Sequence, residues 1–168
     1  MKVRDDDKLR SKLVDYVQDA HAMELSVSLM LESMIDAAKD AKTKEMLQSH
    51  LEQTQEHKRR MDERLEALDS HRSLRKTGEA VAAALPKGLI DRFRTDQAGK
   101  IARDGYVAEA LEIAAYSLLE QLAIRCGDES TAEAARMNRA DEEEMAKKIA
   151  ATWGDAIDMT LEQEGIAA

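Results

Sequence analysis

The sequence contains few of the residues that interrupt helices or support β-sheets. Its 168 residues include 7 glycines and 1 proline, and only 3% are aromatic, whereas 35% are charged. The abundant alanine, leucine, methionine, glutamate and lysine favour helix, so the composition argues against a sheet-rich fold. With 9 methionines beside 1 phenylalanine and 1 tryptophan, the core is expected to consist of flexible side chains that suit interdigitating helices.

Thiols and long apolar runs are also scarce. The single cysteine, Cys126, has no second thiol for an internal disulfide, and its position before Gly127 predicts a small packed thiol or a helix-end residue. No run of about 18 apolar residues occurs, so no segment is expected to span a membrane. The first residues, Met-Lys-Val-Arg followed by three aspartates, lack the apolar stretch of a signal peptide. We therefore expect a soluble, cytoplasmic protein.

The charge balance disfavours two classes of partner. A formal net charge of −9 gives the protein an average field that repels phosphate, so neither nucleic acid nor an anionic membrane is an expected partner. The local basic stretches, residues 58–60 and 92–100, are interpreted as solvated helix faces.

A repeat with an offset of 88 residues relates the two halves of the chain. Glu24 in Met-Glu-Leu matches Glu112 in Leu-Glu-Ile, and the segment 40–43 matches 128–131. A degenerate repeat that spans two helices and a turn indicates two copies of one helical hairpin. Because a single hairpin leaves an apolar face bare, two such hairpins are expected to pack as a four-helix bundle.

Apolar residues recur at the three- and four-residue spacing of buried helical faces. We predict helices over residues 6–39, 43–68, 101–125 and 131–153, followed by a short C-terminal helix. Residues 69–100 hold the only proline and three of the glycines. They are predicted to form a long helical crossover along the bundle, within a single domain of residues 1–168; a linker between independent domains is the alternative.

The inward faces of the second pair of helices are also predicted from this spacing. The third helix is expected to bury one apolar stripe, which comprises Val107, Leu111, Ala114, Leu118 and Leu122. The fourth helix is expected to line its inner side with residues that include Glu142 and Trp153.

Carboxylates on these inward faces suggest a site at the bundle centre, because a buried charge needs a partner. Glu24, His57, Glu112 and Glu142 form the natural set, and Glu109 and His21 lie within reach. Bundles that bind two irons use one Glu from each of two helices and a Glu-x-x-His pair from each of the other two. Carboxylates and imidazoles are ligands that iron and manganese accept.

The sequence departs from that di-iron pattern in each half. The second helix has Thr54-x-x-His57, without the acid, and the fourth has Glu142-x-x-Met145, without the histidine. The remaining residues suit one metal ion with mixed oxygen and nitrogen ligands better than two bridged ions. The alternative is that these glutamates are half-solvated edge residues and that His57 is a hydrogen-bonded core residue. His50 and His71 are assigned surface or turn positions.

Several motifs occur in the order and spacing of a known family. They are Asp19-Ala-His-Ala-Met-Glu24, His50-Leu-Glu-Gln-Thr54 with His57 and Arg60, and Tyr106 followed by Glu109-Ala-Leu-Glu-Ile-Ala-Ala-Tyr116. With these motifs the chain resembles the YciE/YciF family of bacterial ferritin-like stress proteins. The resemblance covers most of both hairpins and little of the crossover.

This resemblance implies a ferritin-like bundle, often dimeric, that is linked to stress and has no established reaction. Carried over by position, the suspected metal ligands of the family fall on Glu24, His57, Glu109, Glu112 and Glu142. Gln53 and Thr54 stand where related sequences often place an acid, which disfavours oxidase chemistry.

Three functions follow from these observations. The first is a stress-associated protein that binds one iron or manganese ion without established catalysis. The second is a metal-free scaffold that acts through a protein partner. The third, an enzyme such as a ferroxidase or a peroxide scavenger, is disfavoured by Thr54 and Met145. A homodimer, formed through the crossover or the terminal helix, is the expected assembly.

Overall fold

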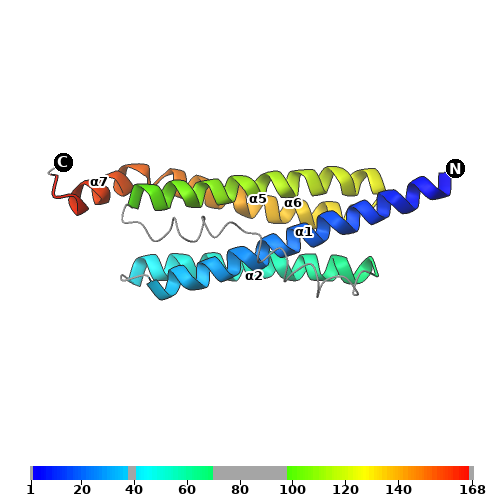
Figure 1. The fold of residues 1–168 in the computed structure, drawn as a ribbon, viewed down its shortest axis with the longest axis horizontal. Coiled ribbons are helices and arrows are strands. Elements are labelled where there is room, and N and C mark those ends of the chain that lie inside the picture. Colours follow the sequence, from blue (N-terminus) through cyan, green and yellow to red (C-terminus); the bar gives the residue numbers. More distant parts are fainter. Residues whose placement is uncertain (1, 38–40, 70–97, 167–168) are drawn as a thin grey trace.

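The protein is an elongated bundle of helices. The computed structural model describes residues 2–37, 41–69 and 98–166, and the N- and C-termini lie at opposite ends (Figure 1). The helices are α1 (Lys2–Ala37), α2 (Ala41–Ala67), α5 (Ala98–Cys126), α6 (Glu129–Ala150) and α7 (Trp153–Gln163). The described ranges contain no strand. Most of the predicted crossover, residues 70–97, lies outside them.

The long helices form two hairpins, as the sequence repeat predicts. α1 packs against α2 and α5 packs against α6, and the two hairpins meet through α1 with α5 and α2 with α6 (Figure 1). The predicted all-α four-helix bundle is therefore confirmed. None of the described helices is both long enough and apolar enough to cross a membrane.

The turn between α5 and α6 has a clear local cause. Gly127 adopts a positive φ of 71°, which glycine tolerates without steric cost, and the backbone N–H of Asp128 donates to the carbonyl of Ala123 at 3.0 Å. The Asp128 side chain then accepts a hydrogen bond from the backbone N–H of Thr131 at 3.0 Å and caps α6. Two adjacent residues thus end one helix and begin the next.

Apolar layers enclose a polar level in the middle of the bundle. On one side lies the main core, which joins residues from all four long helices: Leu13, Val17, Met61, Leu65, Tyr116, Leu119 and Ala135, with several alanines. On the other side, Val27, Leu31 and Leu47 form a smaller cluster between α1 and α2. Along α1, Glu24 lies between Val17 and Val27, and along α2, His57 lies between Leu47 and Met61, so both lie between the two apolar layers.

The predicted inward stripe of α5 is wrong. Val107 is 54% exposed, and Leu111 and Leu118 are each 59% exposed. The buried residues instead include Ala108, Glu109, Glu112, Tyr116, Leu119 and Ala123. The inner face of α5 carries Glu109, Glu112 and Glu120, so a prediction that follows apolar residues selects the outer face.

The last two helices are divided earlier than predicted. α6 ends at Ala150, and Trp153 begins α7 instead of lining the bundle. The Trp153 side chain is 39% exposed. Its ring contacts the Tyr106 ring edge-on, with centroids 5.6 Å apart. α7 packs against the start of α5, where a side chain at Gly99 would lie only 3.3 Å from Ile157. A larger residue at position 99 would therefore require Ile157 to shift by a few tenths of an ångström.

Candidate metal centre

All four long helices contribute to a buried cluster of carboxylates and imidazoles. We call its six members the carboxylate–histidine cluster: Glu24 of α1, His50 and His57 of α2, Glu109 and Glu112 of α5, and Glu142 of α6. All six side chains are buried. Such a concentration of ionisable groups in a core requires compensation by protons, partners or a bound cation.

The first group of converging atoms comprises Glu24, His57 and Glu142. The His57 Nδ1 atom lies 2.8 Å from Oε1 of Glu142 and 3.7 Å from Oε1 of Glu24. One ligand atom from each residue lies within 4.8 Å of the other two. Three helices thus direct one nitrogen and two carboxylates toward a common point.

A second group comprises His50, Glu109 and Glu142. The His50 Nε2 atom lies 3.7 Å from Oε1 of Glu109 and 4.0 Å from Oε2 of Glu142. These ligand atoms also lie within 4.8 Å of one another. Glu142 therefore belongs to both groups, and its two oxygens face different histidines: Oε1 faces His57 and Oε2 faces His50.

Many of these atoms have no hydrogen-bond partner among the described residues. They are Glu24 Oε2, His50 Nε2, His57 Nδ1, Glu109 Oε2, both carboxylate oxygens of Glu112, and Glu142 Oε1. Buried polar atoms are normally satisfied, so these atoms are available to a bound cation or to water. The His57 Nδ1 and Glu142 Oε1 atoms lie 2.8 Å apart, close enough to share a proton or to approach one cation together.

The pKa values of the cluster side chains are raised, so these side chains tend to keep their protons. Burial, together with the neighbouring Glu142, raises the pKa of Glu109 from 4.5 to about 10. Burial and the surrounding carboxylates also raise the pKa values of Glu112 and Glu24. Burial alone would lower the pKa of His57, but its contacts with Glu142 and Glu24 raise it to about 10.

Tyr116 fixes the carboxylate of Glu24. Its buried hydroxyl donates a hydrogen bond to Glu24 Oε1, and its ring meets the His57 ring edge-on with centroids 6.3 Å apart. Burial raises the pKa of the Tyr116 hydroxyl well above its usual value, so the phenol remains a donor. Glu24 is held by one oxygen, and its other oxygen remains available.

Of the five residues predicted for the site, Glu24, His57 and Glu142 fall in the first group and Glu109 falls in the second. Glu112, the fifth, is buried and interacts electrostatically with Glu24, Glu109 and Glu142. For the sixth, His50, the predicted surface or turn position is wrong, because His50 is buried beside Glu109 and Glu142. The sequence does carry a signal for it: His50 precedes His57 by two helical turns, which places both on one face of α2.

Two other histidines do not join the cluster. His21, which the sequence places within reach, instead has its Nε2 atom 2.8 Å from Oδ1 of Asp62. This pair links α1 to α2. His71 lies outside the described residues.

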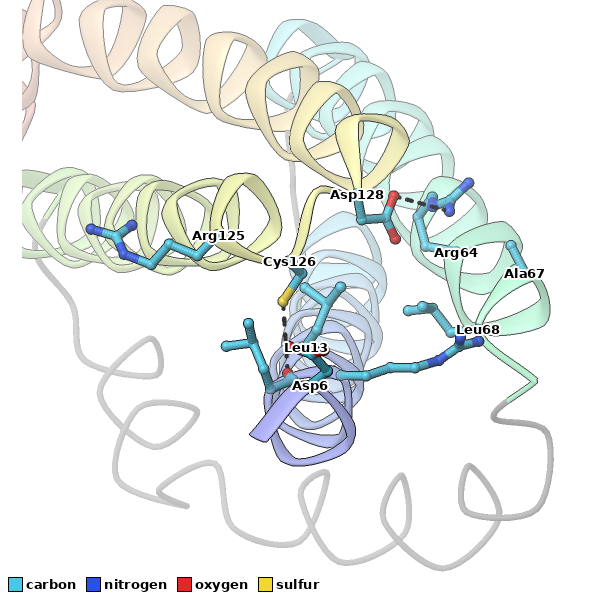
Figure 2. A pocket seen from close by; sticks show the side chains of 10 residues that line it. Asp6, Leu13, Arg64, Ala67, Leu68, Arg125, Cys126 and Asp128 are labelled. Atoms are coloured by element: carbon cyan, nitrogen blue, oxygen red, sulfur yellow. Dashed lines mark hydrogen bonds and ion pairs between the residues drawn. The ribbon is translucent and has the colours of Figure 1, made fainter. Parts of the chain in front are cut away.

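A separate pocket of about 430 Å³ lies at the end of the bundle near the α5–α6 turn (Figure 2). Arg64 contributes to its wall and pairs with Asp128 at 3.4 Å. Cys126 also lines the pocket, and its thiol donates to the backbone carbonyl of Leu9 at 3.7 Å. The pocket shares no residue with the carboxylate–histidine cluster.

Comparison with known proteins gives a consistent family match. Residues 8–162 match a family described as a domain of unknown function, DUF892. A solved protein from Xanthomonas campestris pv. campestris is 24% identical with a TM-score of 0.72, and the match covers 94% of this chain and 99% of that chain. The Escherichia coli stress protein YciF is 19% identical with a TM-score of 0.72, and the match covers 90% and 96% of the two chains. At these identities the likeness shows a shared fold.

Proposed function

The chain belongs to the DUF892 family, in agreement with its YciE/YciF-type motifs, and from this premise we propose a metal-binding function. In this proposal, a single ferritin-like domain holds iron or manganese at the carboxylate–histidine cluster. The primary position is formed by Glu24, His57 and Glu142. A second position, formed by His50 and Glu109, shares Glu142, and Glu112 lies in the same buried cluster as a further ligand.

The division of the two Glu142 oxygens between two histidines carries this proposal. Oε1 of Glu142 faces His57 Nδ1 at 2.8 Å and Oε2 faces His50 Nε2 at 4.0 Å, and Oε1 and both of these nitrogens have no hydrogen-bond partner among the described residues. A carboxylate in this arrangement is suited to bridging two adjacent cations. His50 and Glu109 supply a nitrogen and an oxygen to the second position. They replace in part the acid absent at Thr54 and the histidine absent at Met145.

The composition of the cluster suits iron or manganese. It combines hard carboxylate oxygens with borderline imidazole nitrogens, which both metals accept, and includes no thiolate, which disfavours a soft ion such as Cu⁺. When bound, such ions supply Lewis acidity and redox capacity. We assign no reaction to the protein, because the cluster specifies ligands for a metal and no group for a substrate.

The biological setting is proposed from the comparisons. The E. coli relative is described as a stress protein, and we propose that this chain acts in a bacterial stress response in the cytoplasm. Storage or sequestration of iron or manganese is the role that the buried cluster supports most directly.

Metal titration tests the proposed function. We expect iron or manganese, added at 100 times its dissociation constant, to stabilise the folded state by about 2.7 kcal/mol. For a chain of this size that raises the melting temperature by roughly 5–10 °C, and a chelator should reverse the change. Elemental analysis of protein purified without an affinity tag should give one or two ions per chain. An unchanged melting temperature and no metal uptake would instead support a metal-free scaffold.

The scaffold alternative has its own support in the exposed face of α5. We call Val107, Leu111, Ala114 and Leu118 the α5 stripe; their spacings of four, three and four residues are those of a coiled-coil seam. The three larger side chains are more than half exposed. We propose that the stripe pairs with its copy in a homodimer, because isologous contacts are the common case.

Substitution in the α5 stripe tests the dimer. We expect Leu118→Asp to convert a dimer to a monomer, measured by sedimentation equilibrium, because it buries an unpaired charge in the seam. Leu29→Asp is the matched control, since Leu29 is 51% exposed on α1 and lies outside the stripe. A monomeric wild type, or a dimer that Leu118→Asp leaves intact, contradicts the proposal.

A further inference from the structure

His57 is held from both sides by neighbouring residues of α6. Its Nδ1 atom faces Glu142 at 2.8 Å, and its Nε2 atom lies 3.0 Å from Oδ2 of Asp141, with which it forms a hydrogen bond. Asp141 and Glu142 are consecutive, so their side chains leave the helix about 100° apart. The imidazole ring lies between them, with one nitrogen directed to each carboxylate.

Asp141 differs from the cluster in its surroundings. Its side chain is 37% exposed, whereas those of His57 and Glu142 are 1% and 2% exposed. Arg60 donates to the same Oδ2 atom at 3.4 Å and to Oδ1 of Asn138 at 2.7 Å. Asp141 Oδ2 thus faces both the His57 Nε2 atom and the Arg60 guanidinium, and a charge-assisted contact of this kind holds the carboxylate in place beside the ring.

Asn138 links this surface network to the backbone of α2. Its side-chain amide donates to the carbonyl of His57 at 3.4 Å. Arg60 is on α2 and Asn138 and Asp141 are on α6, so the network fixes the distance between these two helices beside the ring. The edge-on contact with Tyr116 restrains the ring from the α5 side.

From this geometry we infer that Asp141 is a positioning residue that selects the metal-binding nitrogen of His57. By accepting the Nε2–H, Asp141 leaves Nδ1 as the nitrogen directed to Glu24 and Glu142. This inference rests on the proposed function and deepens it. Partners that hold the second nitrogen of a metal-bound histidine commonly alter metal affinity by about 10- to 100-fold.

The chain offers a closely matched control for Asp141. Asp62 contacts another buried histidine, His21, through Nε2 at 2.8 Å, and its side chain is likewise 37% exposed. It also pairs with a cation, Lys58, at 2.9 Å. Removal of Asp62 therefore subtracts the same charge from a similar histidine contact without touching His57.

The first test compares affinities for Mn²⁺ in the full-length chain. We expect Asp141→Ala to weaken binding by about 10- to 100-fold, and Asp62→Ala to change it by less than about threefold. Asp141→Asn should lie between these values, since its amide oxygen can still accept the Nε2–H. Equal affinities for Asp141→Ala and Asp62→Ala would overturn the inference.

A second measurement reads the ring nitrogens directly. In zinc-loaded protein with ¹⁵N-labelled histidine, long-range ¹H–¹⁵N spectra should show His57 bound through Nδ1, with Nε2 protonated. Binding through Nε2 in the wild type would overturn the inference.

Spectra of the metal-free protein separate this inference from the proposed function. There, the Nε2–H of His57 should be protected from exchange with solvent in the wild type and in Asp62→Ala, and should exchange rapidly in Asp141→Ala, where the acceptor that holds it is gone. If the wild type binds neither Mn²⁺ nor Zn²⁺, the proposed function fails. The Nε2–H signal still decides whether Asp141 orients the ring.

Discussion

Replacement of Glu142 by glutamine should abolish metal uptake at both positions. Glu142 is the one residue shared by the Glu24–His57 and the His50–Glu109 groups, and glutamine keeps its size while it removes the anionic charge. We expect the ion content to fall from one or two per chain to none, measured by elemental analysis after equilibration with iron or manganese. His50→Ala should remove only the second position and leave one ion bound.

The neighbouring glutamate provides the control. Glu144 lies two residues away on α6, is 65% exposed and pairs with Lys148 at 2.7 Å. Glu144→Gln removes the same charge from the same helix, and its metal content should equal that of the wild type. Full metal content in Glu142→Gln would rule out the shared carboxylate, and a parallel loss in both variants would indicate a general electrostatic effect.

Metal affinity should rise steeply with pH. In the metal-free protein the pKa values of Glu109 and His57 are both raised to about 10, so near neutral pH these groups hold protons that a cation must displace. Each displaced proton strengthens apparent binding about tenfold per pH unit. Displacement of one proton thus predicts roughly 100-fold tighter binding of Mn²⁺ at pH 8 than at pH 6.

Calorimetry in buffers of different ionisation enthalpy would count the released protons directly. At least one proton per ion is expected. Affinity that is constant from pH 6 to pH 8, without proton release, would contradict the raised pKa values.

The stability of the metal-free protein should show the opposite dependence on pH. A group whose pKa is higher in the folded state binds its proton more tightly there, so its contribution is complete below the unfolded pKa and is lost as the pH rises. For Glu109 the window runs from its ordinary value of 4.5 to about 10, and for His57 from 6.5 to about 10. The free energy of unfolding should therefore fall across this range, and added metal should offset the fall.

The fold is largely predictable because its determinants are local. Capping and helix-ending residues such as Gly127 act within a few positions, and the 88-residue repeat by itself identifies two hairpins. On α1 and α2, apolar residues at helical spacing lie on the buried face: Leu13, Val17, Met61 and Leu65 are all buried. On these helices the apolar face and the inward face coincide.

α5 shows where periodicity fails. Its longest apolar stripe, which includes Leu111 and Leu118, is exposed, and its inner face instead holds Glu109, Glu112 and Tyr116. Hydrophobic periodicity locates an apolar face without specifying which partner covers it. The polar inner face and the apolar outer face of α5 are both explained if the helix serves a buried site on one side and a second copy on the other.

The sequence by itself determined the helical class, the paired hairpins and the five carboxylate and histidine positions expected at the bundle centre. Only the tertiary structure decided that His50 joins them, that His21 pairs with Asp62 instead, and that the oxygens of Glu142 face two histidines. The physical reason is the range of the interactions. Helix formation depends on neighbours within a few residues, whereas the convergence of side chains depends on the rotation and separation of four helices packed together.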